Sequence, residues 1–290
     1  MCTKPYDIPT YDEKGKIDGW LKVPCRCCAE CQRDYSDGWA FRAQLELSVN
    51  PKAVMLTLTY SPLFLALQNM EYADGTVNSL QVEVFQLWLK RFRRLIEPDK
   101  VRFFASGEYG ENFTQRPHYH VIMFGIDNEH PIFKEKRPVV RHGKIDHYYI
   151  QNFPSWRYGQ VEISATPLDA GAVRYATKYV GKKHRGRDAV RIYKDMMKHP
   201  EFILMSRKPG IGADGLKKLL SYYEHNPYGH CGKRVIALPR YIIDKIDELV
   251  DYDFKELLKI RNAEYRKTHP NNVNLKQKEK NLNAKNKVVR

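Results

Sequence analysis

Apolar and polar positions alternate along several short stretches in the middle of the chain. Residues 54–60 place Val54, Leu56 and Leu58 on one side and Thr57 and Thr59 on the other, as a half-buried β-strand does. The same reasoning predicts strands over residues 101–106, 118–124 and 159–165, and helices over residues 78–97 and 168–180. The order strand, helix, three strands, helix predicts an α+β fold, with an antiparallel sheet and helices on one face.

The remaining segments are predicted from the patterns around this unit. Asn78 and Gln81 form a capping box at the start of the first helix, residues 127–150 resemble a polar insertion, and helices are expected over residues 216–225 and 239–260. We expect four parts: a Cys-rich amino-terminal segment (1–45), the α+β domain (46–185), a mainly helical extension (186–260) and a basic, disordered tail (261–290).

Composition and charge narrow the classes of function. The 290 residues are 42% hydrophobic, enough for a sizeable core, and the net charge of +15 indicates an acidic partner, most simply nucleic acid. The chain holds no apolar run near the roughly 18 residues of a membrane span, and residues 1–20 lack the apolar stretch of a signal peptide. We therefore expect neither a membrane protein nor a secreted one.

Four of the six cysteines lie within seven residues. Cys25, Cys28 and Cys31 are spaced three apart, and in a reducing compartment such a cluster is more often a metal site than a set of disulfides. A tetrahedral zinc site needs a fourth ligand, either Cys2 or Cys27. The alternative is a group of reduced, half-buried thiols.

A second group of candidate ligands lies on two successive strands. His118 and His120 share one strand face, with Cα atoms about 6.6 Å apart, which one cation can bridge. Glu108, at the end of the preceding strand, is a possible third ligand. Two imidazoles and a carboxylate suit Mg²⁺ or Mn²⁺ acting as a Lewis acid on a phosphate. The alternative is a pair of ordinary strand histidines.

Two tyrosines lie four residues apart on the last predicted helix of the domain. Tyr175 and Tyr179 therefore share a helix face, roughly 6 Å apart. Such pairs are usually buried, but this one has basic neighbours: Arg174, Lys178, Lys182 and Lys183. A nearby lysine can lower the pKa of a phenol or neutralise phosphate charge.

Taken in order, these motifs resemble a known family. Thr57-Leu-Thr59, then Gly107-Glu-Tyr-Gly110 and Arg116-Pro-His-Tyr-His120, then Tyr175-x-x-x-Tyr179-x-x-Lys182 are similar to the HUH endonucleases of rolling-circle replication. The Cys-rich segment followed by Trp39 and Arg42 most resembles the replication initiators of gokushovirus-type microviruses. The resemblance spans about residues 1–183, with a further family-like stretch at residues 206–212.

The resemblance implies an enzyme that nicks and rejoins single-stranded DNA. His118, His120 and Glu108 would hold the divalent cation, and Tyr175 or Tyr179 would attack the phosphate with charge assistance from Lys182. The implied partners are the viral origin, as single-stranded and replicative-form DNA, and host replication proteins in the cytoplasm of a bacterial cell. Further residues would contact DNA: Arg116, Arg174, Lys178, Lys183, Arg207 and Lys208.

Other functions stay open at this point. A transposase or relaxase of the same superfamily would share the histidines, although a transposase typically uses one tyrosine. A non-catalytic, zinc-containing nucleic-acid-binding protein would leave the tyrosine pair unexplained. Residues 206–212 are either a Pro-Gly turn or a cationic loop whose backbone N–H groups approach a DNA phosphate.

Overall fold

A seven-stranded sheet organises the computed structural model, which describes residues 2–71, 78–110, 115–177 and 189–268. Every pair of neighbouring strands is antiparallel, so the predicted α+β fold with an antiparallel sheet is confirmed. In spatial order the strands are β6 (Arg137–Arg141), β7 (Lys144–Ile150), β8 (Gly159–Ser164), β3 (Ala53–Tyr60), β5 (Pro117–Phe124), β4 (Arg102–Tyr109) and β9 (Phe202–Met205).

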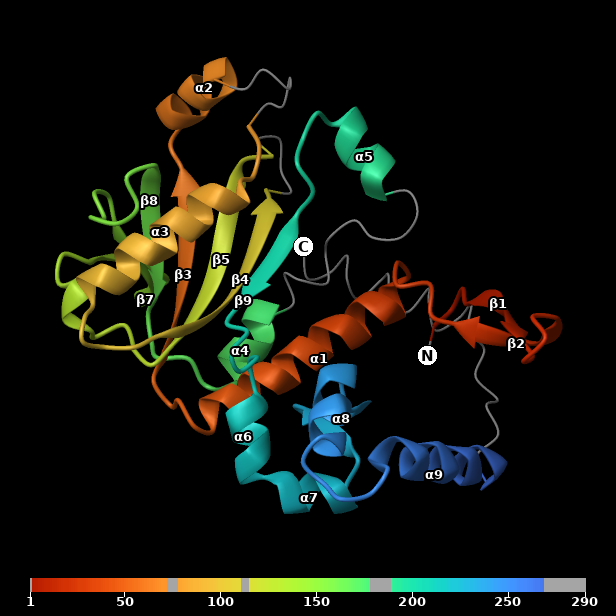
Figure 1. Cartoon of the computed structure of the whole chain (residues 1–290). Coiled ribbons are helices and arrows are strands. Elements are labelled where there is room, and N and C mark those ends of the chain that lie inside the picture. The colour runs from red at the N-terminus through yellow and green to blue at the C-terminus, as the bar shows by residue number, and fades with distance from the viewer. Residues whose placement is uncertain (1, 72–77, 111–114, 178–188, 269–290) are drawn as a thin grey trace.

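Helix α3 (Val82–Leu95) covers one face of the sheet (Figure 1). Its buried side chains Phe85, Trp88 and Phe92 recur at helical spacing and belong to the same core as Leu56 and Tyr119 of the sheet. The helix starts at Val82, so the capping box predicted at Asn78 is wrong. Gln81 precedes the helix with an extended backbone and makes no side-chain cap.

Two helices form a second layer on the opposite face, in addition to the layer predicted from the sequence. These are α1 (Ala29–Leu47) and α4 (Ala170–Thr177), which lie beside each other in Figure 1. Ala43 of α1 and Val173 of α4 share a buried cluster with Phe104 and Ile122, whose side chains point away from α3. The sheet is thus enclosed on both sides.

The edges of the sheet come from segments that were not predicted as strands. Residues 127–150, interpreted as an insertion, contribute the short helix η1 (Pro131–Phe133) and the strands β6 and β7, the latter paired with β8. At the other edge β9 pairs with β4, from Phe104↔Met205 to Gly107↔Phe202. The sheet therefore extends into the region predicted to be a mainly helical extension.

The rest of the region after residue 188 packs mostly against α1. It contains α5 (Ala189–Asp195), α6 (Ala213–Lys218), α7 (Leu220–His225), the hairpin β10 (Tyr228–Cys231) and β11 (Arg234–Ala237), α8 (Arg240–Asp247) and α9 (Phe254–Thr268). The helix expected over residues 239–260 is two helices, because Asp247 and Asp253 accept backbone hydrogen bonds from the start of α9. Since α9 continues to Thr268, irregular chain does not begin at residue 261 as expected. Residues 269–290 lie outside the described residues.

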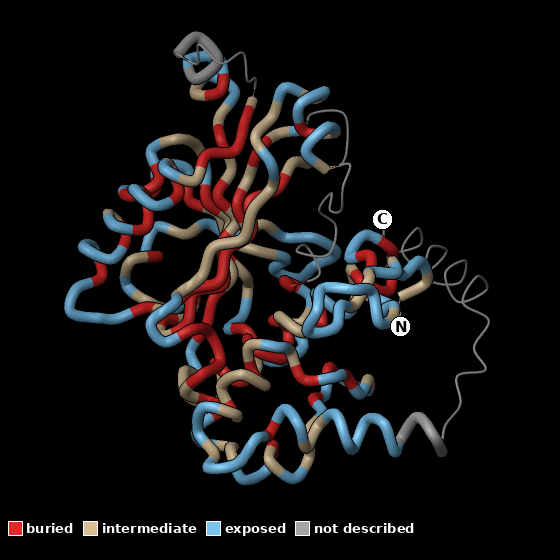
Figure 2. Tube along the Cα trace, turned by 45° about the vertical axis from the view of Figure 1, so that its right-hand side comes forward, coloured by how far each residue is buried: buried red, intermediate tan, exposed pale blue. Residues whose placement is uncertain are grey.

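Two further elements lie away from the sheet body. Helix α2 (Pro62–Glu71) follows β3, and an amino-terminal hairpin of β1 (Tyr6–Tyr11) and β2 (Ile17–Val23) precedes α1 (Figure 1). Figure 2 shows exposed and half-buried colours along this hairpin and buried colours along the strands of the sheet. Among the described residues, no helix combines the length and the hydropathy needed to span a membrane.

Candidate functional site

The register of β4 and β5 brings three candidate ligands together. Glu108 of β4 pairs directly with His118 of β5, and His120 lies two residues further on the same face. The two imidazole rings are 4.8 Å apart between centroids, and one ligand atom from each of the three residues lies within 4.8 Å of the others. The sequence prediction of this group is therefore matched by its geometry.

Hydrogen bonds orient each of the three side chains. Nδ1 of His118 lies 3.1 Å from the carbonyl oxygen of Arg116, and because a carbonyl only accepts, this nitrogen carries the proton and Nε2 keeps its lone pair. Nδ1 of His120 lies 3.2 Å from Oγ1 of Thr57. Oγ of Ser106 donates to Oε1 of Glu108 over 2.6 Å, although this carboxylate is only 5% exposed. The sequence did not indicate Ser106, whose position is defined by pairing with His120.

Tyr119, between the two histidines, points to the other face as expected and is fully buried. Its hydroxyl contacts that of Tyr60 (2.7 Å), donates to the carbonyl of Gln81 (2.9 Å) and accepts from its N–H (3.0 Å). Burial raises the pKa of this phenol well above its usual range. Burial also raises the pKa of Tyr109, whose hydroxyl donates to the carbonyl of His199. Both phenols are structural and poorly suited to act as nucleophiles.

Tyr175 differs from these tyrosines because it is 55% exposed. It lies on α4, where Asp169 caps the first turn by accepting from the N–H of Ala172 (2.7 Å). The other end is fastened to α1, since Oγ of Ser36 donates to the carbonyl of Thr177 over 2.9 Å. The helix packs on the face that carries the histidines, and Tyr175 is not the buried aromatic residue that the alternative interpretation required.

Other residues implied by the resemblance cannot be placed. Tyr179, Lys178, Lys182 and Lys183 all lie outside the described residues. The prediction that both phenols share one helix face toward the histidines therefore stays a prediction.

The basic residues do not form one surface. Arg116 is half-buried and adjoins the histidines through its carbonyl. Arg174 lies so close to Gly232 of the β10–β11 turn that a side chain there would clash with its guanidinium. Arg207 and Lys208 line an open cavity of about 800 Å³ at the start of β4, roughly 20 Å along that strand from Glu108.

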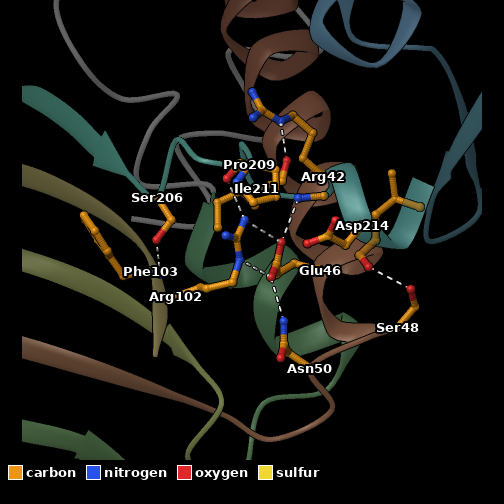
Figure 3. A network of polar contacts seen from close by, with 12 residues as sticks. Arg42, Glu46, Ser48, Asn50, Arg102, Phe103, Ser206, Pro209, Ile211 and Asp214 are labelled. Carbon is orange, nitrogen blue, oxygen red and sulfur yellow. Dashed lines mark hydrogen bonds and ion pairs between the residues drawn. The ribbon is translucent and has the colours of Figure 1, made fainter. Parts of the chain in front are cut away.

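Trp39 and Arg42 hold the 206–212 segment in place (Figure 3). The guanidinium of Arg42 is stacked between the rings of Trp39 (4.2 Å) and Tyr241 (4.0 Å), and its Nε donates to the carbonyl of Ile211. Burial lowers the pKa of Arg42 to about 10, so the group stays charged at neutral pH. Trp39 and Arg42 are thus structural residues.

Glu46 is the buried centre of the same network (Figure 3). Its carboxylate accepts from Nε of Arg102 (2.6 Å) and from the N–H of Gly212 (2.9 Å), and Arg102 also donates to the carbonyl of Pro209. Gly212 has φ +85°, and a Cβ there would lie 2.7 Å from a backbone oxygen of α1, so the close approach requires glycine. The Gly212 N–H is used by Glu46, which favours the structural interpretation of this segment.

The cysteines form a second compact group, at the start of α1. Sγ atoms of Cys2, Cys25, Cys28 and Cys31 all lie within 4.8 Å of one another, whereas Cys27 is exposed. Of the two candidates for a fourth member, the structure brings Cys2 to the cluster.

Comparison with known proteins assigns most of the sheet, the histidines and α4 to one family. Residues 53–184 match the family model of the replication-associated protein ORF2. These residues belong to the ORF2 family of replication-associated proteins. The matched stretch, called the ORF2 segment below, contains Glu108, His118, His120, Tyr175 and Tyr179, and leaves the cysteine cluster outside.

Three phage proteins are similar over more of the chain. Replication-associated protein VP4 of Bdellovibrio phage phiMH2K is 28% identical over 81% of this chain and 72% of its own length. Replication-associated protein ORF2 of Spiroplasma virus 4 is 31% identical over 71% of this chain and 60% of its own. Replication-associated protein ORF4 of Chlamydia phage 1 is 28% identical over 61% and 42%.

The resemblance to phage replication proteins that the motifs indicated is thus confirmed. The chain spans less than two thirds of the length of two of these three relatives. No solved structure matches the chain.

Proposed function

We propose that this chain initiates replication of a small circular phage DNA by nicking one strand with a tyrosine. One observation carries the proposal: within the ORF2 segment, Glu108, His118 and His120 converge on the sheet face on which α4 presents the exposed Tyr175. A phosphate bound at the three ligands would lie on the side of the sheet from which a phenol of α4 approaches.

The donor set fits a divalent cation. One carboxylate oxygen and two imidazole nitrogens, the Nε2 of His118 among them, already lie within 4.8 Å of one another. Hydrogen bonds with Ser106, Thr57 and the Arg116 carbonyl restrict the rotation of these side chains. Mixed nitrogen and oxygen donors suit Mg²⁺ or Mn²⁺ better than thiolate sites do. The cation, when bound, polarises the scissile phosphate as a Lewis acid.

The proposed chemistry is a transesterification in which atoms balance. The phenolic oxygen of Tyr175 or Tyr179 loses its proton to solvent or a nearby base and bonds to phosphorus, while the bond from phosphorus to the 3′ oxygen breaks. The leaving oxygen takes a proton and becomes a free 3′-OH, and the 5′ end stays attached to tyrosine. Attack of a 3′-OH on this phosphotyrosine reverses the step and joins DNA without ATP.

The surrounding residues have distinct proposed tasks. Arg116, beside the histidines, is available to bind a DNA phosphate, and Lys182 would offset negative charge at the nucleophile. A second tyrosine would allow one site to cut the regenerated origin while the first tyrosine still holds a DNA end. The free 3′-OH would be extended by replication proteins of the bacterial host, so the proposed location of the reaction is the host cytoplasm.

Incubation with single-stranded origin-region oligonucleotides and Mn²⁺, followed by denaturing electrophoresis, tests the proposal. A 3′-labelled oligonucleotide should become covalently attached to the protein, and a 5′-labelled one should be shortened to a product ending in 3′-OH. The matched control is Tyr222→Phe, because Tyr222 is also exposed but lies outside the ORF2 segment.

The rival functions predict different results in the same assay. A non-catalytic nucleic-acid-binding protein would retard the oligonucleotide on a native gel and give no covalent band. A transposase or relaxase would form the covalent band but prefer oligonucleotides from the ends of a mobile element or a transfer origin. Either outcome would overturn the assignment to replication initiation.

A further inference from the structure

We propose that Cys2, Cys25, Cys28 and Cys31 bind one zinc ion, which fixes the β1–β2 hairpin to the start of α1. This site lies outside the ORF2 segment and does not depend on the proposed nicking reaction. The ligands come from three places in the chain: residue 2 before the hairpin, residues 25 and 28 after it, and the first turn of α1.

The spacing of the sulfurs fits a single tetrahedral ion. With zinc–sulfur bonds of about 2.3 Å, neighbouring ligands of a tetrahedron lie about 3.8 Å apart. Sγ of Cys28 and Sγ of Cys2 are 3.9 Å apart, and all four Sγ atoms lie within 4.8 Å of one another. Four thiolates without a histidine or carboxylate are a closed donor set typical of structural zinc.

The backbone is arranged to support thiolates at this point. The N–H of Cys25 points at Sγ of Cys2 and the N–H of Cys28 points at Sγ of Cys25, each over 3.3 Å. Arg26 adopts φ +62°, which turns the chain between these two cysteines. Cys28 is the N-cap of α1, a helix of 19 residues, so the negative charge of the thiolates lies at the positive end of the helix dipole.

The hairpin has no hydrophobic core of its own. No residue of β1 or β2, both described in full, is buried, and the side chains of Tyr11 and Trp20 are largely exposed (Figure 2). An isolated two-stranded hairpin is at best marginally stable in water. The buried group at its base consists of Cys25, Cys28 and Cys31, with Cys2 and Tyr6 packed against them. A metal therefore supplies the fixed point that apolar burial does not.

Metal analysis of the full chain, purified under reducing conditions without added metal, tests this directly. We expect about one zinc per chain in the natural sequence, and loss of most of it in both Cys2→Ser and Cys28→Ser. Two serine variants serve as controls that should keep their zinc: Cys27→Ser, from the same segment, and Cys231→Ser, a buried thiol in β10.

A second readout follows the hairpin itself. Removing zinc with a chelator should expose Lys22 and Arg26 to trypsin at least tenfold faster, while cleavage inside the sheet stays unchanged. Cys2→Ser should behave like the chelated protein and keep its circular dichroism, because residue 2 belongs to no helix or strand.

Three results would overturn the proposal. They are a protein without zinc, a Cys27→Ser variant that loses zinc while Cys2→Ser retains it, or disulfide-linked cysteines by mass spectrometry under non-reducing conditions. His120→Ala separates the two sites, because it should lose nicking and keep zinc.

Discussion

Two groups of metal-ligating side chains in this molecule are supported in opposite ways. Glu108, His118 and His120 project from the central strands of a seven-stranded sheet, with large buried residues such as Trp88 and Phe85 packed on its other face. The four cysteines lie where a hairpin without buried residues meets the first turn of α1. The first group is held by packing and strand register, and the second has almost nothing but its own sulfurs.

The difference teaches which part of each site precedes the metal. Strand pairing fixes Glu108 opposite His118, and the hydrogen bonds from Ser106 and to the Arg116 carbonyl fix the rotamers, so this site is preorganised. The cysteine site gains its order when thiolates share an ion, so its binding energy is also folding energy for the hairpin. Changes at the two sites should therefore have separable effects on DNA cleavage and on local stability.

The largest effect should follow removal of a ligand from the preorganised site. His120→Ala takes away one of three protein ligands, and the loss of several kcal/mol of transition-state stabilisation lowers nicking about a thousandfold. Because β5 is held by its neighbours β3 and β4, the melting temperature should stay nearly unchanged. Rates of oligonucleotide nicking with Mn²⁺, measured beside thermal unfolding, check both statements. Normal nicking by His120→Ala would remove the metal assignment.

A deletion in the core beneath the sheet should affect stability most. Trp88 is fully buried and its Nε1 donates to Oγ of Ser155 over 3.0 Å, so Trp88→Ala should reduce the free energy of unfolding by about 3–5 kcal/mol. Urea unfolding followed by circular dichroism measures the loss. Zinc content should persist in the folded fraction, because the cysteines belong to a different buried cluster. A loss of zinc from that folded fraction would show that the two regions are not independent.

A smaller effect is expected from a residue that positions a ligand. Thr57→Val keeps the shape of the side chain and removes the hydroxyl that lies 3.2 Å from Nδ1 of His120. Loss of a hydrogen-bonding partner behind a metal ligand typically costs about 10–100-fold in metal affinity or activity. The apparent affinity for Mn²⁺, obtained from nicking rates over a metal titration, should fall, and Thr57→Ser should restore it. Equal effects of Val and Ser would mean that Thr57 acts through packing.

The smallest effect should be that of zinc removal on the main unfolding transition. The hairpin contributes no buried residue to the sheet cores, so the change should stay near the ±0.5 kcal/mol typical of surface changes, or about 2 °C or less. Differential scanning calorimetry before and after chelation measures it. A drop of about 10 °C, well beyond that surface range, would indicate that the cysteine cluster supports the whole α1 layer.

The sequence predicted the strands whose pattern is local. β3, β4, β5, β8 and α3 carry strong periodicity and were found close to their observed limits. Helix α1 was not predicted, because it buries Glu30, Asp37 and Glu46 rather than a clean apolar stripe. The partners of these carboxylates are remote in sequence: Arg234 for Asp37 and Arg102 for Glu46. Strand β9 is four residues long, and only its pairing with β4 identifies it.

The candidate site was predictable to the same extent as the sheet. A spacing of two placed His118 and His120 on one face, and the neighbouring strand supplied Glu108. The residues that orient them, Ser106 and Thr57, depend on strand register, which a single sequence does not reveal. Choosing Cys2 over Cys27 likewise required the fold, since 23 residues and a hairpin separate Cys2 from Cys25.

The most direct test of the account is to locate the covalent DNA bond. Trypsin cuts after Arg174, Lys178 and Lys182, so Tyr175 and Tyr179 fall into separate peptides, Tyr-Ala-Thr-Lys and Tyr-Val-Gly-Lys. After reaction with an origin oligonucleotide and nuclease trimming, mass spectrometry should find a nucleotide on one or both of these peptides. The adduct should vanish in the Tyr175→Phe, Tyr179→Phe double variant, because phenylalanine keeps the ring and removes the attacking oxygen. An adduct that persists in the double variant, or that maps to any other residue, would contradict the assignment of the nucleophile to α4 and the residues that follow it.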